Sequence, residues 1–227
     1  TIIFLSAYGR TPNDSFLVYK NNTTMITNFL NSINKDLIEQ IVFFSSTCIY
    51  GRPPKEIPIT EDQTCNPNGY YSLSKLVSEY LININLNCPK AFIRIPGVYG
   101  KSDKNKSVIS SLINKILNNE VIFLYNKGLI LRDYVHVEDI SHVTKYIIDS
   151  KSNITINIAT GESRNLIDLI NIIENCLHKK AKIDFLIEKE KQFDLRFDIK
   201  KLKQYIPDFA PEVMEKGIVR NIKEKTS

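Results

Sequence analysis

Short apolar runs alternate with segments of helical length along most of the chain. The apolar runs fall at residues 1–6, 40–46, 90–96, 121–124, 130–136, 154–158 and 181–187. Helical segments are expected at 15–33, 71–85, 107–119 and 138–149, after 162–165, and in short pieces at 198–204 and 211–222. Strands that alternate with helices favour a parallel sheet with both faces covered. The sequence therefore predicts an α/β fold, without internal repeats.

Composition excludes several classes of protein. The 227 residues are 43% apolar, which is ample for one large or two small cores. The net charge of +5 comes mostly from scattered lysines, which lack the interleaved aromatics and dense arginines of a nucleic-acid site. No apolar run reaches the length of a membrane span, and no signal peptide is visible. We expect neither nucleic acid nor a membrane as a partner.

The cysteines indicate a reducing compartment. The four are Cys48, Cys65, Cys88 and Cys176, and their spacings fit neither a CxxC motif nor a set of metal ligands. Reduced thiols in a cytosol are the expectation for such a pattern. The sequence predicts a cytoplasmic protein without a metal site.

Tyr71 and Lys75 are the strongest chemical signal. Residues four apart share one face of a helix. A nearby ammonium favours the phenolate and lowers the pKa of a phenol, which is ordinarily about 10. Such a pair can donate and accept a proton at an alcohol or ketone, and the Ser46 hydroxyl can add a second hydrogen bond. The spacing alone also fits two solvated helix residues. However, the apolar run 41–44 delivers Ser46 to a strand's carboxyl end, where α/β sheets bind ligands.

Seven ordered segments resemble one family. They are residues 1–7, 22–30, 44–51, 71–75, 94–100, 132–140 and 156–162. Together they are similar to extended short-chain dehydrogenases/reductases, in the NAD-dependent epimerase/dehydratase group that acts on nucleotide sugars. The resemblance implies a Rossmann-like parallel sheet with a smaller C-terminal α/β substrate-binding region. Residues 1–100 would be the C-terminal part of the dinucleotide-binding Rossmann domain. Residues 101–227 would mainly bind substrate, with 130–160 partly returning to the Rossmann domain.

One departure concerns the cofactor. The family's glycine-rich phosphate loop belongs on the first strand–helix turn, but no GxGxxG or GxxGxxG occurs, and the chain opens at Thr1 inside an apolar strand. We expect the N-terminal strands, about 60 residues or two βαβ-type steps, to be missing from this record of a longer protein. The alternative is a complete chain that binds no dinucleotide in the usual way. It would then be a non-catalytic dinucleotide-sensing or scaffold protein, or an inactive remnant.

The resemblance assigns roles residue by residue. Tyr71, Lys75 and Ser46 would be catalytic, with Ser46 also touching substrate. The cofactor, NAD with NADP left open, would contact Leu5, Ser6, Ala7, Asn22, Tyr71, Lys75 and Pro96. Substrate would contact Gly97, Arg132 and Arg196. Arg132 matches a position that grips a nucleotide diphosphate, although an ion pair with Asp133 is an equal reading of it. Gly97 stands where relatives often carry Asn, and Arg196 also reads as a solvated arginine at a strand edge.

The sequence disfavours dehydration and leaves epimerisation and ketone reduction as candidate reactions. Relatives that dehydrate sugars carry Thr-Asp-Glu where this chain has Ser46, Thr47 and Cys48, so dehydration is disfavoured. Epimerisation through a transient ketone needs only Tyr71, Ser46 and a retained cofactor, and ketone reduction is the near alternative. Cys48 is interpreted as a buried apolar residue rather than an acid. The substrate would be a nucleotide-diphosphate sugar, in nucleotide-sugar metabolism and polysaccharide biosynthesis. The family also suggests a homodimer, which the sequence does not show.

Overall fold

The computed structural model describes residues 1–9, 13–101, 103, 107–187 and 192–226. The chain divides into two compact units. The first comprises Thr1–Glu56, Thr60–Ile95 and His142–Ile158, and the second comprises Ile57–Ile59, Pro96–Ser141 and Ala159–Ser227. Each unit is therefore built from separate stretches of the sequence.

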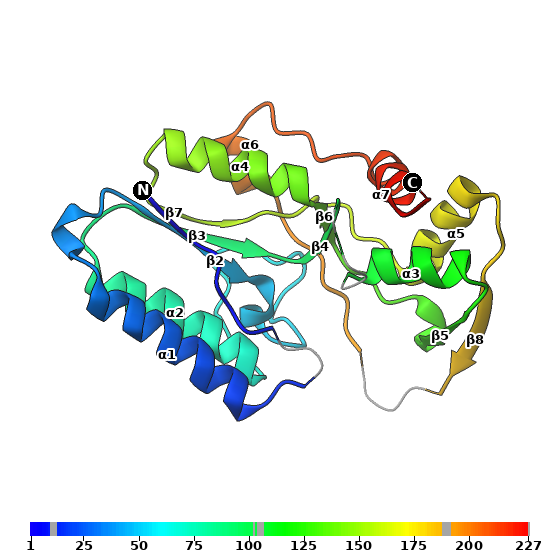
Figure 1. The fold of residues 1–227 in the computed structure, drawn as a ribbon, viewed down its shortest axis with the longest axis horizontal. Helices are drawn as coiled ribbons and strands as arrows, with labels where there is room; N and C mark the ends of the chain where they lie inside the picture. Colours follow the sequence, from blue (N-terminus) through cyan, green and yellow to red (C-terminus); the bar gives the residue numbers. More distant parts are fainter. Residues whose placement is uncertain (10–12, 102, 104–106, 188–191, 227) are drawn as a thin grey trace. The chain divides into compact units, whose positions relative to one another are not determined.

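A four-stranded parallel sheet forms the centre of the first unit (Figure 1). Its strands, in spatial order, are β1 (Ile2–Phe4), β2 (Ile41–Ser46), β3 (Lys90–Ile95) and β7 (Ile154–Asn157). The register places Ser46 beside Ile95 and Ile93 beside Ile156. Strands buried on both faces carry continuous apolar runs rather than alternating ones. The predicted α/β fold with a Rossmann-like parallel sheet is confirmed.

Helices cover both faces of this sheet. The helices α1 (Phe16–Ser32) and α2 (Tyr70–Asn85) lie side by side on one face, and α4 (Val137–Asp149) lies on the other (Figure 1). Ile26 and Ile82 pack with Ile41 and Phe43 beneath α1 and α2. On the other face, the Gln40 amide donates to the Ile147 carbonyl at 3.0 Å. No helix in the described part of the chain is long and apolar enough to cross a membrane.

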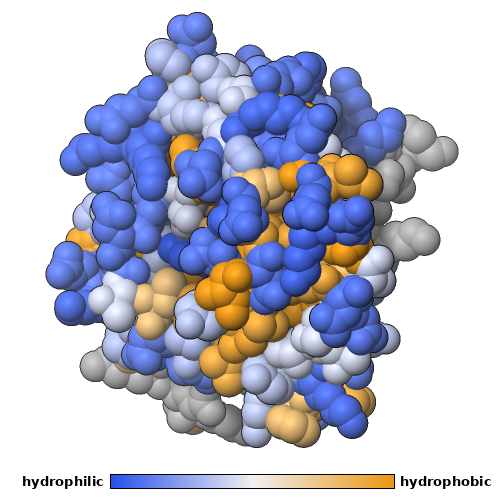
Figure 2. Space-filling view, turned by 90° about the vertical axis from the view of Figure 1, so that its left-hand side faces the viewer, coloured by the Kyte–Doolittle hydropathy of each residue, from blue (hydrophilic) through white to orange (hydrophobic). Residues whose placement is uncertain are grey.

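Strand β1 is an edge of the sheet and exposes apolar surface. Ile3 is 44% exposed, and Leu5, directly after the strand, is 61% exposed. Figure 2 shows a band of hydrophobic residues crossing one face of the molecule between hydrophilic areas. An apolar strand edge offers unpaired backbone groups to another strand. This edge is the place in the sheet where further strands would pair.

The described residues of the second unit include two small parallel ladders and several helices. Strand β4 (Gly97–Tyr99) pairs with β6 (Tyr134–His136), and β5 (Val121–Tyr125) pairs with β8 (Lys182–Leu186). The helices are α3 (Val108–Leu117), α5 (Leu166–Leu177), α6 (Lys200–Tyr205) and α7 (Met214–Thr226). One core joins Tyr99 to α3, α5 and α7. The amphipathic faces of these helices therefore share a single apolar interior.

Some elements differ from the sequence prediction. The run 130–136 forms a strand only from Tyr134, because Arg132 makes an isolated antiparallel bridge with Arg164 instead. Residues 97–99 form the unexpected strand β4. Residues 101–106 are expected from their polar sequence to form a mobile substrate loop, and of these only Lys101 and Asp103 lie among the described residues. The other predicted elements begin and end within a few residues of the observed ones.

A short 3₁₀ helix, η2 (Thr47–Tyr50), continues β2 and ends at Gly51. Gly51 has φ of 83° and ψ of −179°, a region that only glycine occupies readily. A Cβ built there would stand 2.1 Å from the Asn66 carbonyl oxygen. The turn that begins at Ser46 therefore requires a glycine, with no Cβ, at position 51.

We expect Gly51→Ala to lower the free energy of unfolding by about 2 kcal/mol or more, because it adds backbone strain and a backbone clash. Chemical denaturation followed by circular dichroism measures this change. Gly9→Ala is the control, because a Cβ at Gly9 has no heavy atom within 4 Å. Equal stability of the two variants would contradict the assigned role of Gly51.

Candidate active site

Ser46 ends β2 and caps η2. Its hydroxyl oxygen accepts the Cys48 N–H at 3.3 Å. Ser46 is half-buried, and its strand neighbour Ile95 ends β3. The predicted placement of this hydroxyl at the carboxyl end of a parallel strand agrees with the geometry found. It leaves the hydroxyl at the edge of the sheet where ligands of α/β proteins bind.

Lys75 reaches this same edge from α2. Its ammonium donates to the Phe44 carbonyl at 2.7 Å and lies 4.9 Å from the Phe43 ring centroid. Only 4% of the residue is exposed. Burial lowers the pKa of Lys75 to about 8, against the raising effects of Cys48 and Glu79. The site therefore holds a desolvated cation against the Phe44 carbonyl, two residues before Ser46.

Tyr71 stands one helical turn before Lys75. The Lys75 ammonium lies 5.9 Å from the centroid of the Tyr71 ring, so the two side chains share one face of α2. The Tyr71 backbone N–H donates to the Asp14 carboxylate at 2.8 Å. A carboxylate suits the first turn of a helix, where N–H groups lack helical partners. Asp14 thus anchors the turn of the helix that carries Tyr71.

Asn22 holds the loop after β1 against α2. Its Oδ1 accepts the Tyr8 N–H at 2.7 Å, and its Nδ2 donates to the Tyr8 carbonyl at 3.1 Å and to Ser74 Oγ at 3.0 Å. Asn22 is 6% exposed. The sequence predicted a cofactor contact here, and the geometry adds an organising role: this amide sets the course of residues 5–8. Leu5, Ser6 and Ala7 themselves are exposed.

Three of the predicted substrate residues, Gly97, Arg132 and Arg196, belong to the second unit, whereas Ser46 belongs to the first. Gly97 donates its N–H to the Asp133 carbonyl at 3.2 Å, and a Cβ on Gly97 would stand 2.7 Å from the Tyr134 ring. Pro96 precedes it and is half-buried. Close approach to Tyr134 explains the glycine at this position, where any side chain would collide.

Arg132 is held by backbone carbonyls. Its Nη1 donates to Leu131 at 2.8 Å and to Phe193 at 2.5 Å. The Asp133 carboxylate instead accepts N–H groups of Thr160 and Gly161, both at 3.0 Å. Burial raises the pKa of Asp133, and these hydrogen bonds oppose the rise. Arg196, exposed, lies three residues beyond Phe193, so the two predicted arginines come from adjoining segments.

A hollow of about 300 Å³ opens in the second unit. It is lined by Val98, Tyr99, Gly100, Lys101, Asp103, Ser107 and Val137. The ring of Tyr99, which lines the hollow, meets the buried His136 ring edge to face, with ring centroids 5.1 Å apart. Burial raises the pKa of Tyr99, as do nearby carboxylates beginning with Asp139. The phenol therefore stays neutral and serves as part of the wall.

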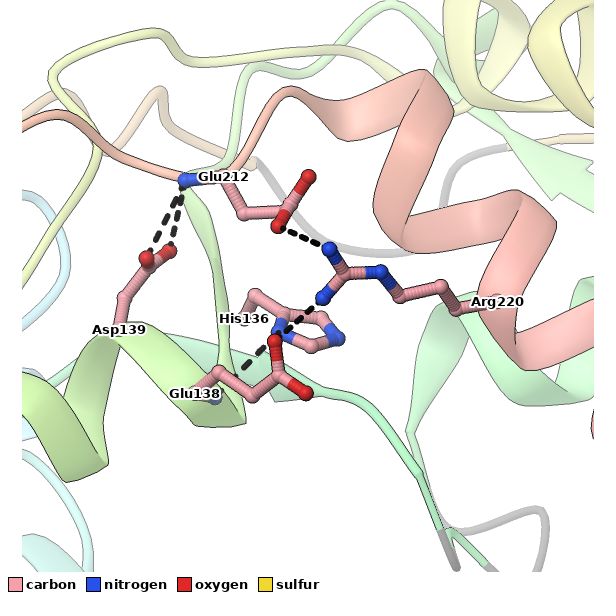
Figure 3. A network of polar contacts seen from close by, with 5 residues as sticks. All are labelled: His136, Glu138, Asp139, Glu212 and Arg220. Carbon is pink, nitrogen blue, oxygen red and sulfur yellow. Dashed lines mark hydrogen bonds and ion pairs between the residues drawn. The ribbon is translucent and has the colours of Figure 1, made fainter.

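A polar network fastens the C-terminal helix near this hollow (Figure 3). The Arg220 guanidinium pairs with Glu138 and, through Nη2 at 3.2 Å, with Glu212. The Asp139 carboxylate accepts the Glu212 N–H at 3.0 Å. Burial raises the pKa of Asp139, and the hydrogen bond from Glu212 opposes the rise. The network ties α7 to the first turn of α4, and sequence patterns alone did not indicate it.

The cysteines and acidic residues form no disulfide and no metal-ligand group in the described part of the chain. None of the four cysteines forms a disulfide, and no group of three or more His, Cys, Asp or Glu residues among those described could hold a metal ion. Cys48 is half-buried rather than buried. The predicted burial of Cys48 was therefore wrong in degree, and the thiol lies close enough to the Lys75 ammonium to raise its pKa.

A family model described as the NAD dependent epimerase/dehydratase family matches residues 1–159. The chain belongs to this family. The predicted membership and the family's cofactor, NAD, are confirmed at this level, and the family is one of enzymes.

Two curated relatives indicate related but different activities. The chain is 30% identical over 202 residues to a Methanocaldococcus jannaschii protein named as a candidate UDP-glucose 4-epimerase, covering 85% of this chain and 65% of that one. It is 32% identical over 165 residues to an Escherichia coli dTDP-4-dehydro-6-deoxyglucose reductase, covering 69% and 52%. The chain thus spans between half and two thirds of the lengths of these relatives.

Solved structures share the fold. The UDP-N-acetylglucosamine 4-epimerase of Methanobrevibacter ruminantium M1 matches with a TM-score of 0.88 at 24% identity, covering 99% of this chain and 76% of that one. The UDP-glucuronic acid 4-epimerase of Bacillus cereus, solved with UDP-glucuronic acid and NAD, matches with a TM-score of 0.80 at 22% identity, covering 92% and 69%. At these identities the likeness establishes the fold alone.

The lowered pKa of Lys75 predicts a pH dependence of stability. Between pH 8 and its ordinary value of 10.5, the unfolded chain keeps the Lys75 proton that the folded chain has lost. The unfolded state then binds more protons, so the free energy of unfolding rises with pH relative to Lys75→Met, by at most about 3 kcal/mol. Denaturant titrations of both proteins across this range measure the difference.

Lys145→Met is the matched control, because the Lys145 side chain is 76% exposed. Its stability should follow that of the wild type across the same pH range. Parallel profiles for wild type and Lys75→Met would show that the folded chain does not depress the Lys75 pKa.

Proposed function

We propose that the chain forms the catalytic part of an NAD-dependent nucleotide-sugar epimerase that works through a transient keto sugar. The observation that carries this proposal is the buried Lys75 ammonium. It bonds to Phe44, two residues before Ser46, and lies 5.9 Å from the ring of Tyr71. A phenol, an ammonium and a hydroxyl from two neighbouring elements are the groups that proton exchange at a secondary alcohol needs.

The roles of these residues follow from their chemistry. Tyr71, as a phenolate, accepts the proton of the sugar hydroxyl while the carbon that bears this hydroxyl gives up a hydride. Tyr71 returns the proton when the hydride is returned to that carbon. Lys75 stabilises the phenolate by its charge. Ser46 donates a hydrogen bond to the reacting oxygen. NAD supplies the hydride acceptor and donor when bound.

The residues present suit a dinucleotide at this edge. An ammonium carries three donors, and Lys75 directs one of them to Phe44, which fits a cation that also holds ribose hydroxyls. Asn22 sets the course of the exposed residues Leu5, Ser6 and Ala7 through Tyr8, and we assign these three, with Pro96, to the cofactor. We assign residues 1–100 to the dinucleotide-binding domain, and 101–227 mainly to substrate binding, with 130–160 partly returning to the former.

For the substrate we propose a nucleotide-diphosphate sugar, held by Arg132 and Arg196 near Gly97. A guanidinium suits phosphate oxygens because it donates two parallel hydrogen bonds. The carbonyls of Leu131 and Phe193 hold Arg132 in place before a ligand arrives. Preorganised donors lose less entropy on binding. The product would serve polysaccharide biosynthesis.

Ketone reduction is the second candidate. Identity to the E. coli reductase, 32%, is as high as identity to the candidate epimerase, 30%. The two reactions share Tyr71, Lys75 and Ser46 but differ in cofactor balance. The protein expressed from its native gene, given UDP-glucose and a trace of NAD, interconverts epimers without net cofactor loss if it is an epimerase. Given dTDP-4-dehydro-6-deoxyglucose, a reductase consumes one reduced cofactor per product.

We expect Tyr71→Phe to lower kcat by about 10²-fold or more, because the proton acceptor is lost while the ring remains. Turnover of UDP-glucose by the native-gene product measures this change, with circular dichroism to check folding. Tyr70→Phe is the matched control, since Tyr70 precedes it on α2 and is 44% exposed. Undiminished turnover in Tyr71→Phe would overturn the catalytic assignment.

We further propose a cytoplasmic homodimer. Cysteines that form no disulfide suit the cytoplasm. A stripe of apolar side chains runs along the outer side of α2, where Leu73, Tyr80 and Ile84 are 38%, 64% and 59% exposed. Residues spaced seven and four apart face one way along a helix. An isologous contact of this stripe with its copy would bury it.

The double variant Tyr80→Lys with Ile84→Lys should therefore sediment as a monomer, because four like charges would face each other across the contact. Sedimentation velocity compares it with the wild type. Leu37→Lys, at an exposed position on η1 (Lys35–Leu37), should leave the dimer intact. A dimeric double variant would place the interface elsewhere.

A further inference from the structure

Arg94 is a buried cation inside the first unit. It lies in β3 and is 8% exposed, between otherwise apolar strand residues. Its Nε and Nη2 donate to the two carboxylate oxygens of Glu79, at 3.2 and 2.8 Å. This is the two-bond arrangement that arginine makes best with a carboxylate. Burial alone would lower the pKa of Arg94, and Glu79 raises it above its ordinary value, so the guanidinium stays charged.

The third nitrogen of Arg94 extends the network to η2. Its Nη1 donates to Tyr50 Oη at 2.9 Å and to the Glu61 carbonyl at 3.2 Å. Tyr50 in turn donates to Asn157 Oδ1 at 2.8 Å. Burial raises the pKa of Tyr50 to about 12, against the lowering effect of Arg94. The phenol therefore remains a neutral hydrogen-bonding link.

The two ends of this network lie on the two elements of the proposed catalytic site. Tyr50 is the last residue of η2, which Ser46 caps. Glu79 stands four residues after Lys75, which stands four after Tyr71, so all three occupy one face of α2. Arg94, on β3, bonds to Glu79 on this face of α2 and to Tyr50 on η2, and so connects the two elements.

We propose that Glu79, Arg94 and Tyr50 are positioning residues that set the turn of Ser46 against the face of α2 that carries Tyr71 and Lys75. The catalytic meaning of this placement rests on the proposed function. An apolar core would hold α2 on the sheet equally well, but it would tolerate small slides along the helix axis. A helix rises about 1.5 Å per residue, and a misplacement near 1 Å can cost about 10²-fold in rate. Directional bonds restrict such slides.

Two variants test the proposal. Tyr50→Phe removes only the hydroxyl that links η2 to Arg94 and keeps the ion pair. Glu79→Leu with Arg94→Met replaces the pair by apolar side chains of similar length, an exchange that buried pairs often tolerate without loss of stability. If the double variant does not fold, Tyr50→Phe carries the test. Lys145→Met, which breaks the exposed pair with Asp149, is the matched control.

Hydrogen exchange read by mass spectrometry needs no substrate. We expect both variants to speed exchange of the backbone amides at 47–51 by about tenfold, a local opening, while amides of α1, in the same unit, exchange as in the wild type. A merely structural pair would raise exchange throughout the unit in step with lost stability. Where the native-gene product turns over UDP-glucose, kcat should fall about tenfold or more and KM should change less than about threefold.

The outcomes separate the two proposals. Local exchange at 47–51 equal to the wild type, or exchange raised equally throughout the first unit, overturns the positioning role. Undiminished kcat in an active protein also overturns it, and leaves the proposed function standing. Faster local exchange in a protein that turns over no nucleotide sugar contradicts the proposed function alone. The network then keeps its assigned role of holding η2 against α2.

Discussion

The first unit depends on one hydrogen bond between an ammonium and a strand carbonyl. Lys75 is desolvated, which costs free energy that only a close partner can offset. The Phe44 carbonyl is that partner, at 2.7 Å, and it sits at the end of β2 because β2 stops pairing at Ser46. This bond fixes which face of α2 is turned toward the end of β2. Tyr71, on the same face of α2, and Ser46, at the end of β2, are positioned with it.

Much of this arrangement could be predicted from the sequence. Apolar runs at 40–46 and 90–96 gave a buried parallel sheet because its strands need apolar residues on both faces. The spacing of Tyr71 and Lys75 gave a shared helix face. Both rely on local periodicity, which a single sequence carries. Strand β4 (Gly97–Tyr99) escaped because three residues carry too little periodicity.

The remaining part depends on contacts between distant segments. The buried pair of Glu79 and Arg94 needs the fold to bring α2 onto β3, and only an arginine within an apolar strand hinted at it. Asp14, which anchors Tyr71, lies 57 residues away in sequence. Cys48 was expected to be buried and is half-buried, because the tight turn η2 gives no periodic signal from which burial could be predicted. Sequence patterns predict elements well, whereas polar partners depend on tertiary placement.

Asn22 fixes the alignment of α1 with the loop after β1 and with α2. A single amide contacts Tyr8 on the loop after β1 and Ser74 on α2, so three segments meet at one planar group. Inserting or deleting one residue in α1 before Asn22 would turn this amide by about 100° around the helix axis. The loop would then lose its anchor although α1 kept its helical form. Substitutions of exposed side chains on α1 should therefore be tolerated, whereas insertions or deletions in α1 before Asn22 should not.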